Sequence, residues 1–266
     1  MEQRHIIRRA LLLPLLTALL GMVAFPPADG ATRFDPIGHR GYTASRTENT
    51  LPAIRAAVRR GAAAVEVDVR VTRDAKMVLM HDRGVARTTD GRGYVDRMTS
   101  AQIAELRTPD GARVPFVRQA ARVARRLGTT LVLELKSGPD RGWTRWQVRE
   151  LRRVLVKRQM FNRSLVFSFN AELLRRVESA VPGFQTSWIL RRWPSLRKIR
   201  RQGVDNVSMP VRVVGRRKVR RLERHGISAF GRNANRRWSW ERFERAGVTG
   251  VVTDRVPAYV DWDGNG

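Results

Sequence analysis

The 266-residue sequence contains no cysteine and few acidic residues. The absence of cysteine excludes disulfides, thiolate metal sites, a cysteine nucleophile and a lipid-modified cysteine anchor. Only 24 Asp and Glu residues accompany 52 Lys and Arg residues, so the formal net charge is +28. A surface of this charge favours anionic partners, such as phosphates, cell-wall polymers or membrane headgroups.

Sequence signals of nucleic-acid binding are also missing. There is no zinc-finger spacing, no aromatic RNA-binding signature and no basic zipper. The arginines run through the whole sequence after the amino terminus instead of gathering in one segment. We therefore predict a solvated, arginine-rich surface on helices and no nucleic-acid partner.

The amino terminus has the pattern of an export signal. A basic stretch, "MEQRHIIRRA", precedes the apolar stretch "LLLPLLTALLGMVAF" and the small residues of "PPADGA". The apolar stretch is short for a membrane span. We predict a signal peptide over residues 1–30, a folded domain over residues 31–266, and a secreted or cell-envelope location. An uncleaved membrane anchor is the alternative.

Short apolar segments alternate with amphipathic, arginine-rich segments beyond residue 33. The predicted strands are residues 34–39, 63–69, 76–81, 130–136, 164–169, 184–190, 204–209, 226–230 and 248–254. The predicted helices are residues 51–60, 117–127, 143–158, 171–180 and 219–225. This alternation predicts a parallel sheet, and about eight strand–helix units would close a (β/α)8 TIM barrel. A doubly wound open sheet is the main alternative, but no G-x-G-x-x-G follows the first strand.

The list of strands holds one more than a barrel needs. The segments "VEVDVRV" and "KMVLMH" are separated only by "TRDA". Because a parallel crossover needs a dozen or more residues, these two strands are expected to form an antiparallel hairpin.

Three carboxylates lie in predicted strands. Alternation along "VEVDVR" places Glu66 and Asp68 on one face, with valines on the other. Glu134 and Lys136 share one face of "LVLELK" in the same way. Salt bridges to arginines, or a Glu134–Lys136 pair, are simple structural explanations. Three converging carboxylates would equally suit a hard divalent cation, Ca²⁺ or Mg²⁺.

Two of the three histidines beyond residue 30 follow predicted strands. The catalytic residues of a parallel barrel lie at this end of its strands. His39 and Arg40 follow the first strand in "IGHRGY", and His81 ends the hairpin in "MHD". A structural hydrogen-bonding corner is the alternative for such a His-Arg pair. His225 in "RLERHG" lies near a predicted helix end, where a capping or dipole-compensating role is expected.

The order of these motifs resembles the glycerophosphodiester phosphodiesterase family. "HRG", "ENT", "EVDV", "HD", "RTT" and "ELK" occur in sequence, followed by "FSF" and "GVTGVVTD". The resemblance implies a TIM barrel with a small insertion after the HD segment, and metal-dependent hydrolysis of glycerophosphodiesters to glycerol 3-phosphate and an alcohol. It also implies that the glycerol 2-hydroxyl attacks first and that water then opens a cyclic phosphate.

The resemblance also assigns roles to matching residues. His39 and His81 would be the acid–base pair, and Arg40 and Lys136 would contact phosphate or tune the site. The divalent cation, Ca²⁺ or Mg²⁺, would be bound by Glu66, Asp68 and Glu134.

Two segments depart from the family pattern. Thr47 replaces the proline of P-E-N-T, which is common in the family. The segment "FGRN" replaces the family's W-T-V-N. Phe230 therefore replaces a tryptophan expected to line the glycerol pocket, and Arg232 is added nearby. The departures leave open whether the alcohol is choline, ethanolamine, glycerol or a wall teichoic acid unit.

Two other functions remain open from the sequence. One is a phospholipase-like enzyme that releases a cyclic phosphate. The other is a non-catalytic protein that binds anionic envelope polymers through its arginine surface.

Overall fold

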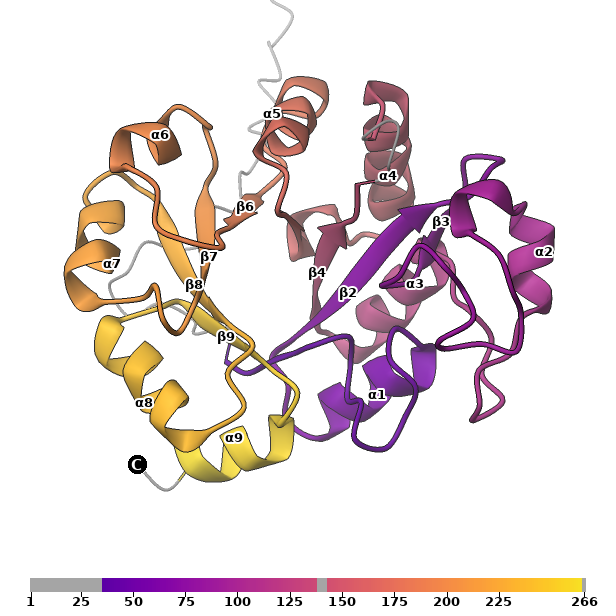
Figure 1. Cartoon of the computed structure of the whole chain (residues 1–266), viewed down its shortest axis with the longest axis horizontal. Coiled ribbons are helices and arrows are strands. Elements are labelled where there is room, and N and C mark those ends of the chain that lie inside the picture. The colour runs from indigo at the N-terminus through magenta and orange to yellow at the C-terminus, as the bar shows by residue number, and fades with distance from the viewer. Residues whose placement is uncertain (1–34, 138–142, 265–266) are drawn as a thin grey trace, which may run out of the picture. The chain divides into compact units, whose positions relative to one another are not determined.

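The computed structural model describes residues 35–137 and 143–264. Eight parallel strands form a closed barrel, because β1 pairs with both β2 and β9. The barrel strands are β1 (Ile37–Gly38), β2 (Ala64–Val71), β4 (Thr130–Leu135), β5 (Ser164–Ser168), β6 (Thr186–Ile189), β7 (Asn206–Pro210), β8 (Ser228–Arg232) and β9 (Gly250–Thr253) (Figure 1). The predicted TIM barrel is confirmed.

Helices surround the barrel on its outer side (Figure 1). These are α1 (Leu51–Arg59), α3 (Val117–Leu127), α4 (Arg145–Lys157), α5 (Ala171–Ala180), α6 (Leu196–Arg200), α7 (Arg216–Glu223), α8 (Arg237–Ala246) and α9 (Val256–Asp263). The sequence did not predict α6, α8 or α9. Helix α6 is only five residues long, and neither α8 nor α9 begins with a side-chain cap of the Ser, Thr, Asp or Asn type.

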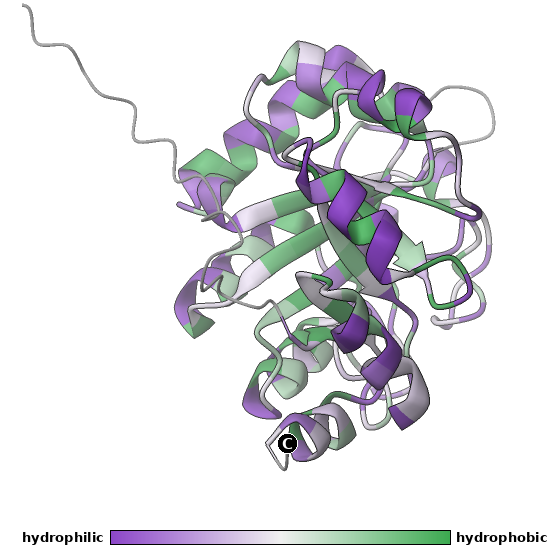
Figure 2. Ribbon diagram, turned by 90° about the vertical axis from the view of Figure 1, so that its left-hand side faces the viewer, coloured by the Kyte–Doolittle hydropathy of each residue, from purple (hydrophilic) through white to green (hydrophobic). Residues whose placement is uncertain are grey.

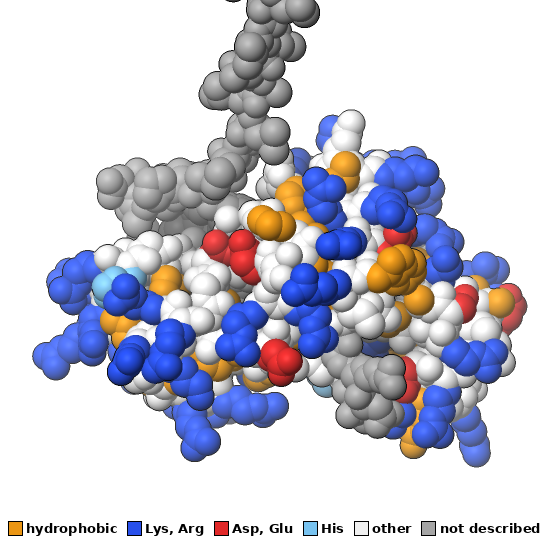
Figure 3. Space-filling model, turned by 90° about the horizontal axis from the view of Figure 1, so that it is seen from above, with side chains coloured by type: hydrophobic (Ala, Val, Ile, Leu, Met, Phe, Trp, Pro, Cys, Tyr) orange, Lys and Arg blue, Asp and Glu red, His pale blue; other side chains and the backbone are white. Residues whose placement is uncertain are grey.

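The main hydrophobic core lies between the strands and these helices. The core includes Val65, Val67 and Val69 of β2, which pack with leucines of β4 and apolar residues of α1 and α3. Figure 2 shows the hydrophobic colouring concentrated on the strands, while the helices carry hydrophilic stretches. Figure 3 shows Lys and Arg side chains spread over one face, with few Asp and Glu side chains among them.

The predicted hairpin is confirmed, and it explains the ninth strand. Strand β3 (Met77–Leu79) pairs antiparallel with β2 and lies outside the barrel. The chain then forms a short insertion with a 3₁₀ turn at Val95–Arg97 and helix α2 (Ser100–Glu105). This insertion has a small hydrophobic core of its own, centred on Val85, Val95 and Ile103.

The predicted signal peptide, residues 1–30, lies outside the described residues, so it remains a prediction. Within the described ranges, none of the helices has both the length and the apolar character needed to cross a bilayer.

Candidate active site

The three carboxylates predicted as metal ligands converge inside the barrel. Asp68 on β2 is the direct register partner of Glu134 on β4, and Glu66 lies two residues earlier on β2. All three side chains are buried, and one oxygen from each lies within 4.8 Å of the others. Strand alternation therefore places the carboxylates on the inner face of the barrel, while the valines between them fill the outer core.

Glu66 shows why this cluster suits a cation. Its Oε2 accepts a hydrogen bond from the Arg40 backbone N–H at 2.9 Å, but its buried Oε1 has no hydrogen-bond partner among the described residues. Burial, and then the neighbouring Asp68 charge, raises the pKa of Glu66 to about 8. A buried carboxylate with an unpartnered oxygen needs either a proton or a cation. The three oxygen donors fit a hard divalent ion.

Lys136 contacts the same carboxylates. Its Nζ lies 2.9 Å from Asp68 Oδ1 and also contacts Glu134 Oε1. Burial opposes charge on Asp68, but Lys136 and Arg40 outweigh it and lower the pKa of Asp68 below its usual value. Burial likewise opposes the charge on Lys136, but Asp68 and Glu134 raise the pKa of that amine. The ion pair proposed from sequence as an alternative to a metal cluster is thus present together with the cluster.

His39 is held by a carboxylate that the sequence did not single out. Its Nδ1 lies 2.7 Å from Oδ1 of Asp254, the residue that follows β9. Asn235 fixes Asp254 in turn, by donating to its carboxylate and by accepting its backbone N–H at 2.9 Å. Burial lowers the pKa of His39, but the Asp254 hydrogen bond and the Glu66 charge outweigh it, so this pKa is raised. With Nδ1 engaged, Nε2 is the nitrogen that remains for proton transfer.

His81 has a matching carboxylate partner. Its Nδ1 lies 2.7 Å from Oδ1 of Asp82. The Arg70 guanidinium donates two hydrogen bonds, of 3.0 and 2.7 Å, to the backbone carbonyl of His81. The hairpin geometry of β2 and β3 therefore fixes the backbone of His81, and Asp82 fixes its ring.

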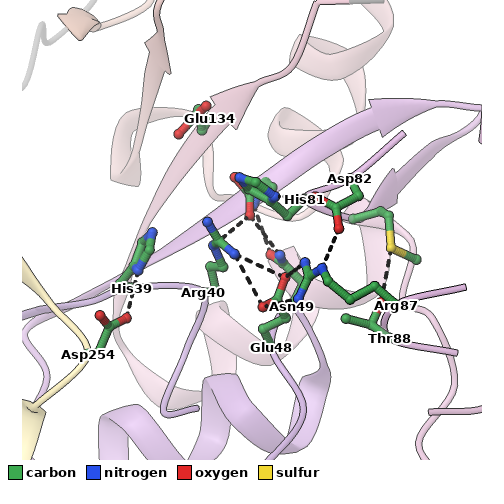
Figure 4. Close-up of polar contacts among 12 residues, drawn as sticks. His39, Arg40, Glu48, Asn49, His81, Asp82, Arg87, Thr88, Glu134 and Asp254 are labelled. Atoms are coloured by element: carbon green, nitrogen blue, oxygen red, sulfur yellow. Dashed lines mark hydrogen bonds and ion pairs between the residues drawn. The ribbon is translucent and has the colours of Figure 1, made fainter. Parts of the chain in front are cut away.

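Arg87, in the "RTT" motif, links the insertion to the first loop of the barrel. Its guanidinium contacts Asp82 and donates hydrogen bonds of 2.6 and 3.0 Å to Glu48 (Figure 4). Glu48 also accepts from Arg40 at 3.2 Å. Although burial opposes the charge on Asp82, Arg87 and His81 lower the pKa of this carboxyl to about 2. The "ENT" and "RTT" motifs thus form one ion-pair chain between the two histidine segments.

The first loop adopts a constrained backbone. Arg40 and Asn49 both have left-handed φ angles, 54° and 59°. The Asn49 backbone N–H donates to the Arg40 carbonyl at 3.0 Å, and the Asn49 side chain donates to Asp68 at 2.8 Å. Gly41 has a φ of 90°, and a Cβ there would lie 2.6 Å from the Ala53 backbone. The glycine of "HRG" is therefore required both by its backbone angle and by the close approach of α1.

The structure does not bring all of the predicted residues to the surface of this site. Phe230 on β8 is only 1% exposed, and its ring packs 5.4 Å from that of Phe167. Arg232, two residues further along β8, is half-buried, and its charge interacts with Glu134 and Glu66. The pocket-lining role of Phe230 remains a prediction. His225 lies just beyond α7 and is not part of the ion-pair chain or the carboxylate cluster.

The family model for the glycerophosphoryl diester phosphodiesterase family matches residues 39–258. The chain belongs to this family. It is a phosphoric diester hydrolase, a glycerophosphodiester phosphodiesterase, as the sequence motifs predicted. The matched residues extend from His39, which directly follows β1, into α9, so they include all of the barrel strands except β1.

The names of similar proteins are consistent with this family. A glycerophosphodiester phosphodiesterase of Caldanaerobacter subterraneus is 27% identical over 239 residues, which are 82% of this chain and 93% of the relative. Human glycerophosphodiester phosphodiesterase 1 is 32% identical over 172 residues, but the match spans only half of that protein. An Oleispira antarctica phosphodiesterase, solved with sn-glycerol 3-phosphate, has the same fold with a TM-score of 0.77. That structure is 22% identical and covers 86% of this chain, which itself spans 96% of the solved chain.

Proposed function

We propose that this chain is an exported, metal-dependent enzyme that hydrolyses glycerophosphodiesters to glycerol 3-phosphate and an alcohol. One observation carries the proposal: two histidines, each with a carboxylate on Nδ1, follow strands β1 and β3, which both pair with β2, and β2 and β4 carry three converging buried carboxylates. The product is suggested by the Oleispira antarctica structure, whose bound molecule is sn-glycerol 3-phosphate.

The carboxylates and the basic residues of the site would have different roles in the reaction. A divalent cation, Ca²⁺ or Mg²⁺, held by Glu66, Asp68 and Glu134, would offset charge on the phosphate oxygens as the reaction proceeds. Arg40 and Lys136 lie against the same carboxylates, and their cationic groups would bind the phosphate.

His39 and His81 would transfer the protons. One histidine would remove the proton of the glycerol 2-hydroxyl, whose oxygen attacks phosphorus. The other would protonate the departing alcohol oxygen as its bond to phosphorus breaks, which leaves a cyclic phosphate. Water would then open the ring with the two roles reversed. Asp254 and Asp82 would keep each imidazole in one orientation and stabilise its protonated form.

Assays with glycerophosphocholine, glycerophosphoethanolamine and glycerophosphoglycerol test the proposal. After chelation, each substrate is assayed with Ca²⁺ or Mg²⁺ and the products are followed by phosphorus NMR. We expect glycerol 3-phosphate as the final product. Accumulation of cyclic phosphate without a monoester would identify a phospholipase-like enzyme instead. Strongly salt-dependent binding to anionic polymer, with no turnover, would identify a binding protein.

Export is supported only by the pattern of residues 1–30 and has its own test. Expression of the full chain, followed by fractionation and amino-terminal sequencing, should give a protein outside the cytoplasm that begins after Gly30. A full-length protein that retains residues 1–30 and sediments with membranes would favour an uncleaved anchor.

A further inference from the structure

An arginine pair lies beside the candidate active site and has no role in the reaction proposed above. The guanidinium carbons of Arg191 and Arg232 both lie 4.6 Å from the ring centroid of Phe169. The three residues come from the carboxyl ends of β6, β8 and β5, which lie at the end of the barrel that carries the site. A single aromatic ring thus contacts two like charges.

Neither arginine forms an ion pair with a carboxylate of the described residues, although the charges of Glu134 and Glu66 act on Arg232 from a greater distance. Among the described residues, no Asp or Glu lies within ion-pair distance of Arg191 or Arg232, and the buried Nε of Arg232 has no hydrogen-bond partner. Arg212 adds a third positive charge and donates to the Arg191 carbonyl at 3.1 Å. Burial lowers the pKa of Arg232, Glu134 opposes this effect, and Arg191 lowers that pKa further. Two guanidinium groups that share one aromatic ring and form no ion pair with the described residues are suited to an anion.

Phe169 lines two hollows, one beside the carboxylate cluster and one beside Arg191. One hollow is lined by Glu134, Lys136 and Phe169. A second hollow is lined by Phe169, Trp188, Arg191, Arg192 and Lys198 and has no acidic residue in its lining. Trp188 donates its indole N–H to the Phe169 carbonyl at 3.2 Å, which fixes the residue shared by the two hollows. A substrate that spans both would place its phosphodiester near Lys136 and its far end near Arg191, whose guanidinium shares the Phe169 ring with Arg232.

We propose that the preferred alcohol half of the substrate carries a second phosphate, which Arg191 and Arg232 bind. This inference rests on the proposed glycerophosphodiester hydrolysis and narrows its substrate to polyanionic diesters. The same cationic surface would repel the quaternary ammonium of a choline headgroup. Arg232 lies on the same face of β8 as Phe230, and its charge acts on both Glu134 and Arg191.

A matched pair of substrates tests the inference. Glycerophosphoglycerol and the same molecule with a phosphate on its far glycerol differ only in the group that the arginines would bind. We expect kcat/KM to be at least about tenfold higher for the phosphorylated substrate, the scale of a charge-assisted hydrogen bond. Equal kcat/KM values, or a preference for the unphosphorylated substrate, would overturn the inference. Absence of turnover on both substrates would instead contradict the proposed hydrolase function.

Substitutions of the two arginines test whether they cause the preference for the phosphorylated substrate. Arg232→Gln should lower the ratio of the two kcat/KM values about tenfold, and the more exposed Arg191→Gln should lower it several-fold. The control is Arg221→Gln, an exposed arginine in the last turn of α7, which should keep the wild-type ratio. If Arg221→Gln lowers the ratio as much as the other two variants, the general charge of the surface explains the preference and the arginine site is wrong. The inference is equally wrong if Arg191→Gln and Arg232→Gln slow both substrates by the same factor.

Discussion

His39 Nδ1 and Asp254 Oδ1 lie 2.7 Å apart although 215 positions separate the two residues in the sequence. Closure of the barrel between β9 and β1 produces this contact: the His39 backbone N–H donates to the Thr253 carbonyl at 3.0 Å. The first and last strands therefore place a histidine and its carboxylate side by side.

We predict that Asp254→Asn lowers kcat by at least about tenfold, because an amide orients the imidazole poorly and does not stabilise its protonated form. Asp254 is a positioning residue, so KM should change much less than kcat. The hydrogen bond from His39 to Asp254 raises the pKa of His39, and its loss should shift the His39 limb of the pH–rate profile to lower pH. A variant with normal kcat and an unshifted profile would contradict this role.

Metal removal should abolish activity. We expect EDTA to inactivate the enzyme and added Ca²⁺ or Mg²⁺ to restore it, because three buried carboxylates converge without enough protein cations to satisfy every oxygen. Glu134→Gln should weaken metal binding in calorimetry while the barrel remains folded. Full activity in excess EDTA, with metal loss verified by elemental analysis, would refute metal dependence.

Glu66 should make the metal-free protein less stable at higher pH. Its pKa is raised to about 8 in the folded state, from 4.5 for an ordinary glutamate, so the folded protein binds the proton more tightly than the unfolded chain. The stabilisation by that proton is present below pH 4.5 and is lost as the pH rises toward 8. Thermal unfolding of the metal-free protein at pH 5 and pH 8 measures this loss. Glu66→Gln should reduce the difference in Tm between these two pH values, and an unchanged difference would contradict the prediction.

The two histidines should behave as one functional unit. Each single change, His39→Ala or His81→Ala, should lower kcat by roughly a hundredfold or more, the scale of a positioned acid–base group. The double variant should be little worse than the poorer single variant, because residues that act on one reaction are not additive. His225→Ala is the internal control and should keep nearly normal turnover. Inactivation of the folded enzyme by His225→Ala, with near-normal turnover in either of the other variants, would reverse the assignment.

Arg87 should affect catalysis more than stability. Arg87→Met removes the bridge between Asp82 and Glu48 and should lower kcat several-fold by releasing the carboxylate that orients His81. Arg87 is about half exposed, so the change in free energy of unfolding should stay within about 1 kcal/mol. Arg153→Met, which removes an exposed i,i+3 pair with Glu150 on α4, should leave kcat unchanged. Equal kcat values for both variants would show that the bridge does not support the site.

The barrel and the carboxylate cluster could be predicted before the structure was known, because both depend on local periodicity. Alternation along β2 and β4 assigns each side chain to a face, and the short connection to β3 permits only a hairpin. Glu66, Asp68 and Glu134 could therefore be placed on the inner faces of neighbouring strands before their distances were known. The motif "HRG" was also visible in the sequence, whereas the left-handed backbone of Gly41 and its close approach to α1 became apparent in the folded structure.

The partners of these residues became apparent in the folded chain. Asp254 meets His39 because the barrel closes, and Arg87 joins Glu48 to Asp82 because the insertion folds back over the first loop. Arg191 and Arg232 meet on Phe169 because the carboxyl ends of three separate strands share one end of the barrel. In a chain with 52 basic residues, no sequence pattern distinguishes these arginines from the many on helix surfaces. Strand periodicity determines the face on which a side chain lies, and it can be recognised in a short segment. Barrel closure and loop packing determine which charges from distant segments become neighbours, and no short segment contains that information.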